Sequence, residues 1–148
     1  MTVRPARPED IPHLGAIAEA AGLFPADMLA DMIAPAFAEA PDLWLVADHE
    51  GAPAGLAFIR PEEMTDRVWN LLALGVAPAA QGHGLASGLL AGVEERLDAR
   101  MIVIETTQLP EQAAARALYA RHGYEEEGRV RDFYAEGEDK VIYRKVLA

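Results

Sequence analysis

Hydrophobic residues over the first forty positions recur mainly at the spacing of helices. Residues 2–6 predict a short edge strand. Four apolar positions then recur every three or four residues, as on one face of a helix: Ile11, Leu14, Ile17 and Ala21. Pro8 suits the first turn of this helix and Gly22 suits its end. A second helix is predicted over residues 25–37, and Pro35 weakens its last turn.

From residue 43 the pattern changes to compact apolar runs. The runs at residues 43–47 and 54–59 flank the turn sequence DHEG and predict a hairpin. A longer and more apolar run at residues 67–76 predicts a third strand. A glycine-rich loop follows, and the helix after it has an apolar stripe formed by Leu85, Leu89, Val93 and Leu97.

The last third of the chain predicts a buried strand, a helix and a closing strand pair. The strand covers residues 101–105, and the helix covers residues 110–122 and ends at Gly123. The closing strands are expected at residues 124–133 and 141–146. The predicted order is β-α-α-β-β-β-α-β-α-β-β, an α+β fold with a mixed, mostly antiparallel sheet flanked by helices. The length of 148 residues suits one domain, residues 1–148.

Composition limits the possible functions. A net charge of −11 argues against nucleic-acid binding and against docking to an anionic membrane, because both need a basic face. The absence of cysteine excludes disulfides, thiolate metal sites and a cysteine nucleophile, and the four scattered histidines show no metal-ligand spacing. No signal peptide or membrane span is apparent, so the expected location is the cytoplasm.

The sequence VAPAAQGHGLASG, residues 76–88, is the strongest candidate for chemistry. No Asp, Glu, Lys or Arg occurs from Val68 to Val93, although 25% of the chain is charged. A helix N-terminus presents unpaired N–H groups and a partial positive charge, and so binds phosphate without a basic side chain. Glycines at 82 and 84 allow close approach of a phosphate, and the side chains of Gln81 and Ser87 add donors. A plain helix start with flexible glycines is the alternative.

Three phosphate-binding folds are compatible with such a loop to different degrees. A P-loop requires Gly-Lys-Ser/Thr, and no lysine is near. A nicotinamide-binding Rossmann site is suggested by Gly82, Gly84 and Gly88, with Glu105 roughly 20 residues further on. Two features oppose it: five residues separate Val76 from the first glycine, and only one βαβ unit is predicted.

The third possibility fits better. The segment Gln81-Gly82-His83-Gly84-Leu85-Ala86 resembles the Q/R-x-x-G-x-G/A signature of the GNAT superfamily of N-acetyltransferases. Downstream, AARALYARHGY at residues 114–124 resembles the superfamily's second conserved segment. The predicted element order is also similar to that of the superfamily over essentially the whole chain.

The resemblance implies acetyl-coenzyme A as cosubstrate, a primary amine as acceptor and no metal. It implies that the pyrophosphate lies on the backbone amides of residues 81–86, assisted by Ser87, and that pantetheine pairs with the backbone of Val76 where the long strand diverges from its neighbour. It further implies an oxyanion-stabilising amide at Leu74 and a general acid at Tyr119. The implied cofactor-binding residues are Leu74, Val76, Gln81, Gly82, His83, Gly84, Leu85, Ala86, Ser87, Gln112 and Tyr119.

Two positions depart from the superfamily's pattern. Asn70 stands where some members carry a glutamate that acts as general base, and Gln112 stands where an asparagine often contacts the cofactor. Asparagine positions water or substrate but does not take a proton. The base is therefore left open among Glu62, Glu63, Asp66, Glu105, a water chain or no base at all.

Three functions follow as alternatives: an acetyl-CoA-dependent N-acetyltransferase, a catalytically weak CoA-binding sensor or scaffold of the same fold, and a nicotinamide-dependent oxidoreductase. The acceptor is a small-molecule or peptide amine. In this fold the last two strands border the acceptor site, so Phe133 and Tyr134 are candidate substrate contacts. Pairing of two copies through exposed strands is an open alternative to a monomer.

Overall fold

The structure, a computed structural model that describes residues 1–147, contains the predicted strands and helices in the predicted order. The strands are β1 (Thr2–Pro5), β2 (Leu43–His49), β3 (Ala52–Pro61), β4 (Val68–Val76), β5 (Met101–Thr107), β6 (Glu125–Ala135) and β7 (Glu138–Val146). The α-helices are α1 (Ile11–Ala20), α2 (Leu29–Ile33), α3 (Leu85–Arg96) and α4 (Ala113–Arg121).

The strands form a mixed sheet in the order β1-β2-β3-β4-β5-β7-β6. Pairing is antiparallel between β1 and β2, β2 and β3, β5 and β7, and β6 and β7. Strands β4 and β5 pair in parallel, with residues 68–71 opposite residues 101–104. The predicted fold class, a mixed sheet flanked by helices, is confirmed.

Backbone contacts divide the chain into two compact units. Unit 1 comprises residues 1–61 and 72–97, and unit 2 comprises residues 62–71 and the chain from residue 98 onward. Strand β4 contributes to both, because its first four residues belong to unit 2 and the rest to unit 1. The single domain expected from the length stays a prediction.

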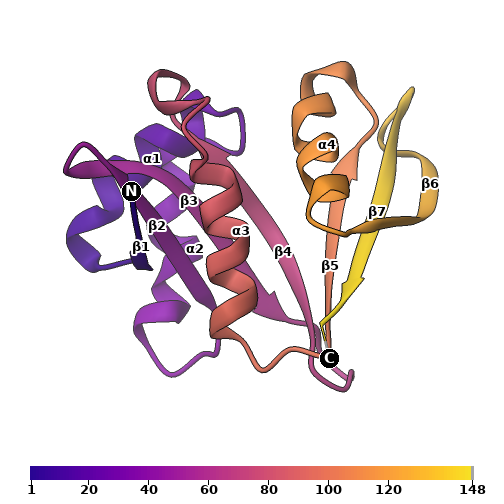
Figure 1. The fold of residues 1–148 in the computed structure, drawn as a ribbon, viewed down its shortest axis with the longest axis horizontal. Helices are drawn as coiled ribbons and strands as arrows, with labels where there is room; N and C mark the ends of the chain where they lie inside the picture. Colours follow the sequence, from indigo (N-terminus) through magenta and orange to yellow (C-terminus); the bar gives the residue numbers. More distant parts are fainter. Residues whose placement is uncertain (148) are drawn as a thin grey trace. The chain divides into compact units, whose positions relative to one another are not determined.

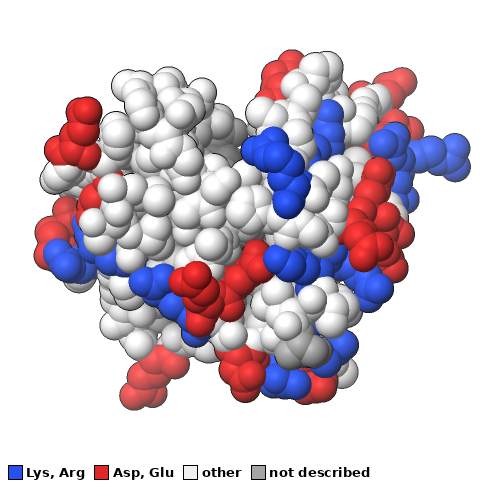
Figure 2. All heavy atoms as spheres, viewed as in Figure 1, with Lys and Arg blue, Asp and Glu red and all other residues white. Residues whose placement is uncertain are grey.

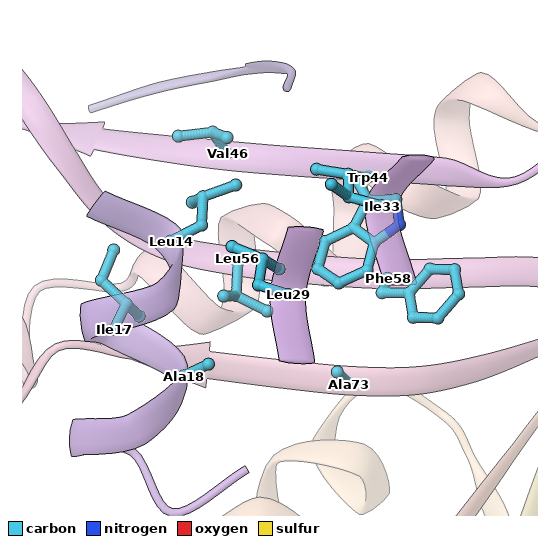
Figure 3. Close-up of a cluster of buried hydrophobic side chains, with 10 residues drawn as sticks. All are labelled: Leu14, Ile17, Ala18, Leu29, Ile33, Trp44, Val46, Leu56, Phe58 and Ala73. Atoms are coloured by element: carbon cyan, nitrogen blue, oxygen red, sulfur yellow. The ribbon is translucent and has the colours of Figure 1, made fainter. Parts of the chain in front are cut away.

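Unit 1 is built around strands β2 and β3, which carry helices on both faces. Helices α1 and α2 lie on one face of these strands, and α3 lies on the other (Figure 1). Figure 3 shows the core under α1 and α2, where Trp44 stacks on Phe58 with 4.3 Å between ring centroids. Ten buried side chains form this cluster: Leu14, Ile17, Ala18, Leu29, Ile33, Trp44, Val46, Leu56, Phe58 and Ala73. Trp44, in the first apolar run of the sequence, is 2% exposed and is therefore a core residue.

The helix ends of unit 1 follow the predicted signals with small differences. Gly22 adopts a left-handed φ of 73° after α1, and the N–H of Leu23 donates to the carbonyl of Ala18. The predicted helix at residues 25–37 is a short α-helix flanked by two 3₁₀ turns, Ala26–Met28 and Ala34–Phe37. Leu97 lies outside α3, because its extended backbone ends the helix at Arg96.

Unit 2 packs α4 against strand β7. The rings of Tyr119 on α4 and Tyr143 on β7 lie 5.8 Å apart between centroids. Gly123 ends α4 with a φ of 88°, as the sequence predicts. Strands β6 and β7 are longer than predicted, and the turn between them contains only Glu136 and Gly137. Gly137 adopts a φ of 82°, and glycine takes this left-handed conformation, which the tight turn requires, without steric cost.

Candidate functional site

The glycine loop leads from a 3₁₀ turn at Pro78–Ala80 into α3. Gly82 and Gly84 have φ values of 81° and 79°, the left-handed region that glycine adopts without steric cost. A Cβ built on either residue meets no protein atom within 4 Å. Gly82 and Gly84 therefore allow the left-handed backbone of the loop, and they leave open space beside it.

The start of α3 has the features of an anion-binding helix N-terminus. Its first helical hydrogen bond runs from the N–H of Gly88 to the carbonyl of Gly84 at 3.0 Å, so the N–H groups of Leu85 and Ala86 precede the ladder. No side-chain hydrogen bond caps the helix at Gly84, and its first turn contains no acidic residue. Figure 2 shows mostly uncharged atoms over the first turns of α3. A partial positive charge here is not cancelled by carboxylates.

Two histidines stack beside this loop. The rings of His49, at the end of β2, and His83 lie 4.7 Å apart between centroids, with 29° between their planes. Gln81 and His83 are exposed. Nothing in the sequence indicates the contact between His49 and His83, because the two residues are far apart along the chain and follow no shared pattern.

Two other glycines serve close packing. A Cβ at Gly88 would lie 2.6 Å from the terminal methyl of Met1, and one at Gly75 would lie 2.8 Å from Leu23 and 3.1 Å from Ala21. Gly75 therefore allows β4 to pack closely against Ala21 and Leu23. Gly88 therefore faces the N-terminal segment, where its neighbours are the end of the exposed Met1 side chain and a methyl group of Val3.

Strand β4 carries three predicted site residues in two environments. Leu74 and Val76 lie in unit 1, where Leu74 is partly exposed and Val76 is 9% exposed. The residue after the strand, Ala77, donates its N–H to the carbonyl of Ala54 at 2.7 Å, which fixes the strand's end to β3. Asn70 lies in unit 2 and is only 4% exposed.

Asn70 is hydrogen-bonded to one of the carboxylates that the sequence left open as a base. Its side-chain Nδ2 donates to Oε1 of Glu62 at 2.7 Å. Two other candidates are paired with cations: Asp66 with Arg67 at 3.3 Å, and Glu105 with Lys140 at 3.1 Å. The structure thus brings together Asn70 and Glu62, which the sequence did not connect.

Tyr119 is buried in a cluster of tyrosines. It is 6% exposed, and its ring lies near those of Tyr124 and Tyr143, at 6.2 and 5.8 Å between centroids. Burial raises the pKa of Tyr119 to about 12, with a smaller contribution from Tyr143. The phenol therefore holds its proton throughout the neutral range. Gln112 lies on the same segment, as the residue preceding α4.

We expect the burial of Tyr119 to appear in the alkaline stability of the fold. The phenolate is disfavoured in the folded state, so this contribution is complete below the ordinary pKa of 10 and is lost as the pH rises towards 12. Wild type should lose up to about 2 kcal/mol more unfolding free energy over this range than Tyr119→Phe. Urea denaturation at pH 9 and pH 11.5 measures the difference. Equal losses in both proteins would contradict the burial of the phenol.

The final strands expose two aromatic side chains. Phe133 and Tyr134 are 53% and 46% exposed, and Nζ of Lys140 lies 4.3 Å from the centroid of the Phe133 ring. Trp69 on β4 is partly exposed. Contact of Phe133 or Tyr134 with a substrate stays a prediction.

Among residues 1–147, no three His, Cys, Asp or Glu side chains gather in a way that would hold a metal ion. Over the same range, no helix combines the length and apolar character needed to span a bilayer.

Comparison with known families decides the assignment. A model of the acetyltransferase (GNAT) family matches residues 15–124, which include β4, the glycine loop, α3 and α4. The chain belongs to the GNAT acetyltransferase family. Both segments that carry the sequence resemblance, residues 81–86 and 114–124, lie inside the match. A search of curated proteins found no match to this GNAT chain.

Solved structures share the fold over nearly the whole chain. A GNAT-family protein from Desulfovibrio desulfuricans is 27% identical, with a TM-score of 0.90 and 99% of each chain covered. The ribosomal-protein-alanine N-acetyltransferase of Brucella melitensis is 24% identical, with a TM-score of 0.82 over 99% of this chain and 100% of that one. The yncA protein of Salmonella typhimurium, solved with acetyl-CoA, is 21% identical, with a TM-score of 0.81 over 100% of this chain and 94% of that one.

Proposed function

We propose that this GNAT chain transfers an acetyl group from acetyl-CoA to a primary amine. The observation that carries the proposal is the start of α3, where left-handed Gly82 and Gly84 precede backbone N–H groups outside the helical ladder. Membership of the family supports it, and the fold is shared with a protein solved together with acetyl-CoA.

The residues of the loop fit a pyrophosphate. The space beside Gly82 and Gly84 is open, no acidic side chain occurs between Val68 and Val93, and N–H groups outside the ladder favour an anion. We assign cofactor binding to the backbone of residues 81–86 and the hydroxyl of Ser87, together with Leu74, Val76, Gln112 and Tyr119. Acetyl-CoA, when bound, supplies an acetyl group activated as a thioester.

Two residues are assigned to the chemistry. The backbone N–H of Leu74 would stabilise negative charge on the carbonyl oxygen that is attacked, because a fixed donor needs no reorganisation as the charge develops. The phenol of Tyr119 would protonate the departing sulfur. Tyr119 carries its proton throughout the neutral range, as a general acid must.

A CoA-binding scaffold of the same fold is the second candidate. It is favoured by one observation: position 70 carries a buried, neutral asparagine where some members of the superfamily have a basic glutamate. The nicotinamide-dependent oxidoreductase has lost its support, because the fold is that of the GNAT family and the sheet pairs largely antiparallel strands.

A thiol-release assay separates the two candidates. Purified protein with acetyl-CoA is tested against spermidine, free amino acids, kanamycin and an alanyl tripeptide, and free CoA thiol is measured. We expect thiol release above the amine-free rate with at least one of these amines. Tight acetyl-CoA binding by calorimetry with no release across the panel would favour the scaffold, and absence of binding would contradict both.

A further inference from the structure

Asn70 has one satisfied and one unsatisfied polar atom, although its side chain is almost completely buried. The residue is 4% exposed and its Nδ2 donates to Glu62, but its Oδ1 has no hydrogen-bond partner among the described residues. A buried acceptor without a partner costs roughly 1–3 kcal/mol. Such an atom is best explained by a donor that arrives from outside the chain.

The carboxylate of Glu62 determines which way the amide of Asn70 points. An ionised carboxylate only accepts hydrogen bonds, so at neutral pH the NH₂ group of Asn70 must face it. The 2.7 Å distance is typical of a hydrogen bond to a charged group. Oδ1 is therefore directed away from Glu62 and meets no donor among the described residues.

The backbone holds Glu62 in place even though its side chain reaches solvent. Its N–H donates to the carbonyl of Val68 at 2.8 Å, and its carbonyl accepts from Oγ1 of Thr65 at 2.8 Å. The N–H of Val68 donates to the same Oγ1 at 3.3 Å. These bonds close the turn between β3 and β4 and fix Glu62 beside Asn70.

Glu62 differs from Asp66 and Glu105 in its surroundings, because both of those candidate bases are paired with cations. Asp66 lies within 3.5 Å of Arg100 as well as 3.3 Å of Arg67, and Glu105 pairs with Lys140. Among residues 1–147, Glu62 has no cationic partner, and its observed side-chain contact is with a neutral amide. Its negative charge is therefore available to a cation or proton from a ligand.

We propose that Glu62 and Asn70 together receive the acceptor amine, with Asn70 Oδ1 accepting an N–H hydrogen bond and Glu62 taking the proton. This inference rests on the proposed acetyltransferase function and names its base. It assigns to a two-residue pair the role that a single glutamate at position 70 would have.

The proton balance is simple. The amine nitrogen, once uncharged, forms the C–N bond to the acetyl carbon and gives up one proton to a carboxylate oxygen of Glu62. The C–S bond of the thioester breaks, and the sulfur takes the proton of Tyr119. Glu62 then releases its proton to solvent, which it reaches directly, and Tyr119 recovers one. Amide, free thiol and unchanged enzyme remain.

The kinetic test uses Glu62→Gln with two matched comparators. We expect E62Q to lower kcat by roughly tenfold or more, while the KM for acetyl-CoA stays unchanged. E63Q, one residue along the same turn, and E105Q should stay within twofold of wild type. The double variant E62Q/N70D, which exchanges the amide and the carboxylate, should recover part of the lost kcat.

The inference would be overturned if E62Q turned over as fast as wild type. It would also be overturned if E63Q or E105Q, and not E62Q, lost tenfold in kcat. Either result would leave the acetyltransferase function intact. No turnover by wild type with any amine of the panel would instead overturn the proposed function, and the inference with it.

A binding test in the absence of acetyl-CoA gives an independent readout. In ¹⁵N-labelled wild type, titration with spermidine or an alanyl tripeptide should shift the side-chain NH₂ resonances of Asn70, because Oδ1 of the same amide accepts the new hydrogen bond. The shift should be at least halved in E62Q, where the attraction for the ammonium is lost. Unmoved Asn70 resonances in wild type at saturating amine would count against the pair.

Discussion

Replacing Gly82 and Gly84 together by alanine is expected to weaken acetyl-CoA binding by roughly a hundredfold, or about 2.7 kcal/mol. Both residues have φ values near 80°, where an alanine is strained by roughly 1–2 kcal/mol. Relief of that strain would turn the N–H groups of the loop away from the phosphate. The added methyl groups would also occupy the open space beside the backbone. Isothermal calorimetry with acetyl-CoA measures the change.

Gly22→Ala is the matched control for this variant. Gly22 has a φ of 73°, and a Cβ there also meets no protein atom within 4 Å. Its replacement carries a similar backbone strain away from the loop, so acetyl-CoA affinity should stay within about threefold of wild type. Equal weakening by both variants would mean that general destabilisation, and not the loop, explains the result.

Tyr119→Phe is expected to lower kcat by roughly ten- to a hundredfold with little change in acetyl-CoA affinity. The substitution removes a single hydroxyl and keeps the ring that packs against Tyr124 and Tyr143. Without the phenolic proton, the sulfur must leave as a thiolate or take a proton from water. Steady-state thiol release with the best amine of the panel measures kcat, and calorimetry measures affinity.

Tyr143→Phe is the control, because it removes a neighbouring phenol from the same cluster. Tyr143 is 8% exposed, and burial raises its pKa as well. Its replacement should leave kcat within about twofold of wild type. A large loss of kcat in Tyr143→Phe with none in Tyr119→Phe would assign the acid to Tyr143, and no loss in either variant would remove a tyrosine acid from the mechanism.

Much of the fold was predictable from local signals. Hydrophobic spacing placed α1, α3 and α4 close to their observed bounds. The ends of α1 and α4 were predictable because Gly22 and Gly123 adopt the left-handed backbone typical of helix ends. The glycine loop was also recognisable, since its signal is contiguous in sequence. Its family membership followed from two motifs in the correct order, which the family match confirms.

Tertiary contacts were not predictable in the same way. The hydrogen bond between Asn70 and Glu62 spans a turn, and the stacking of His49 on His83 joins distant segments, so neither leaves a periodic signal. Gly88 belongs to the loop motif by spacing, yet in the structure it faces the side chain of Met1, at the other end of the sequence from any loop signal. Strand ends at β6 and β7 were misjudged because polar residues continue both strands through to a two-residue turn.

The central claim is that the backbone N–H groups between Gly82 and Ala86 bind the pyrophosphate of acetyl-CoA. Titration of ¹⁵N-labelled protein with CoA, followed by amide NMR, tests it most directly. We predict that the amide resonances of residues 82–86 show the largest saturable shifts, and that adding dephospho-CoA, which keeps the pyrophosphate, shifts the same resonances. Saturable CoA binding that leaves these amides unmoved would contradict the account.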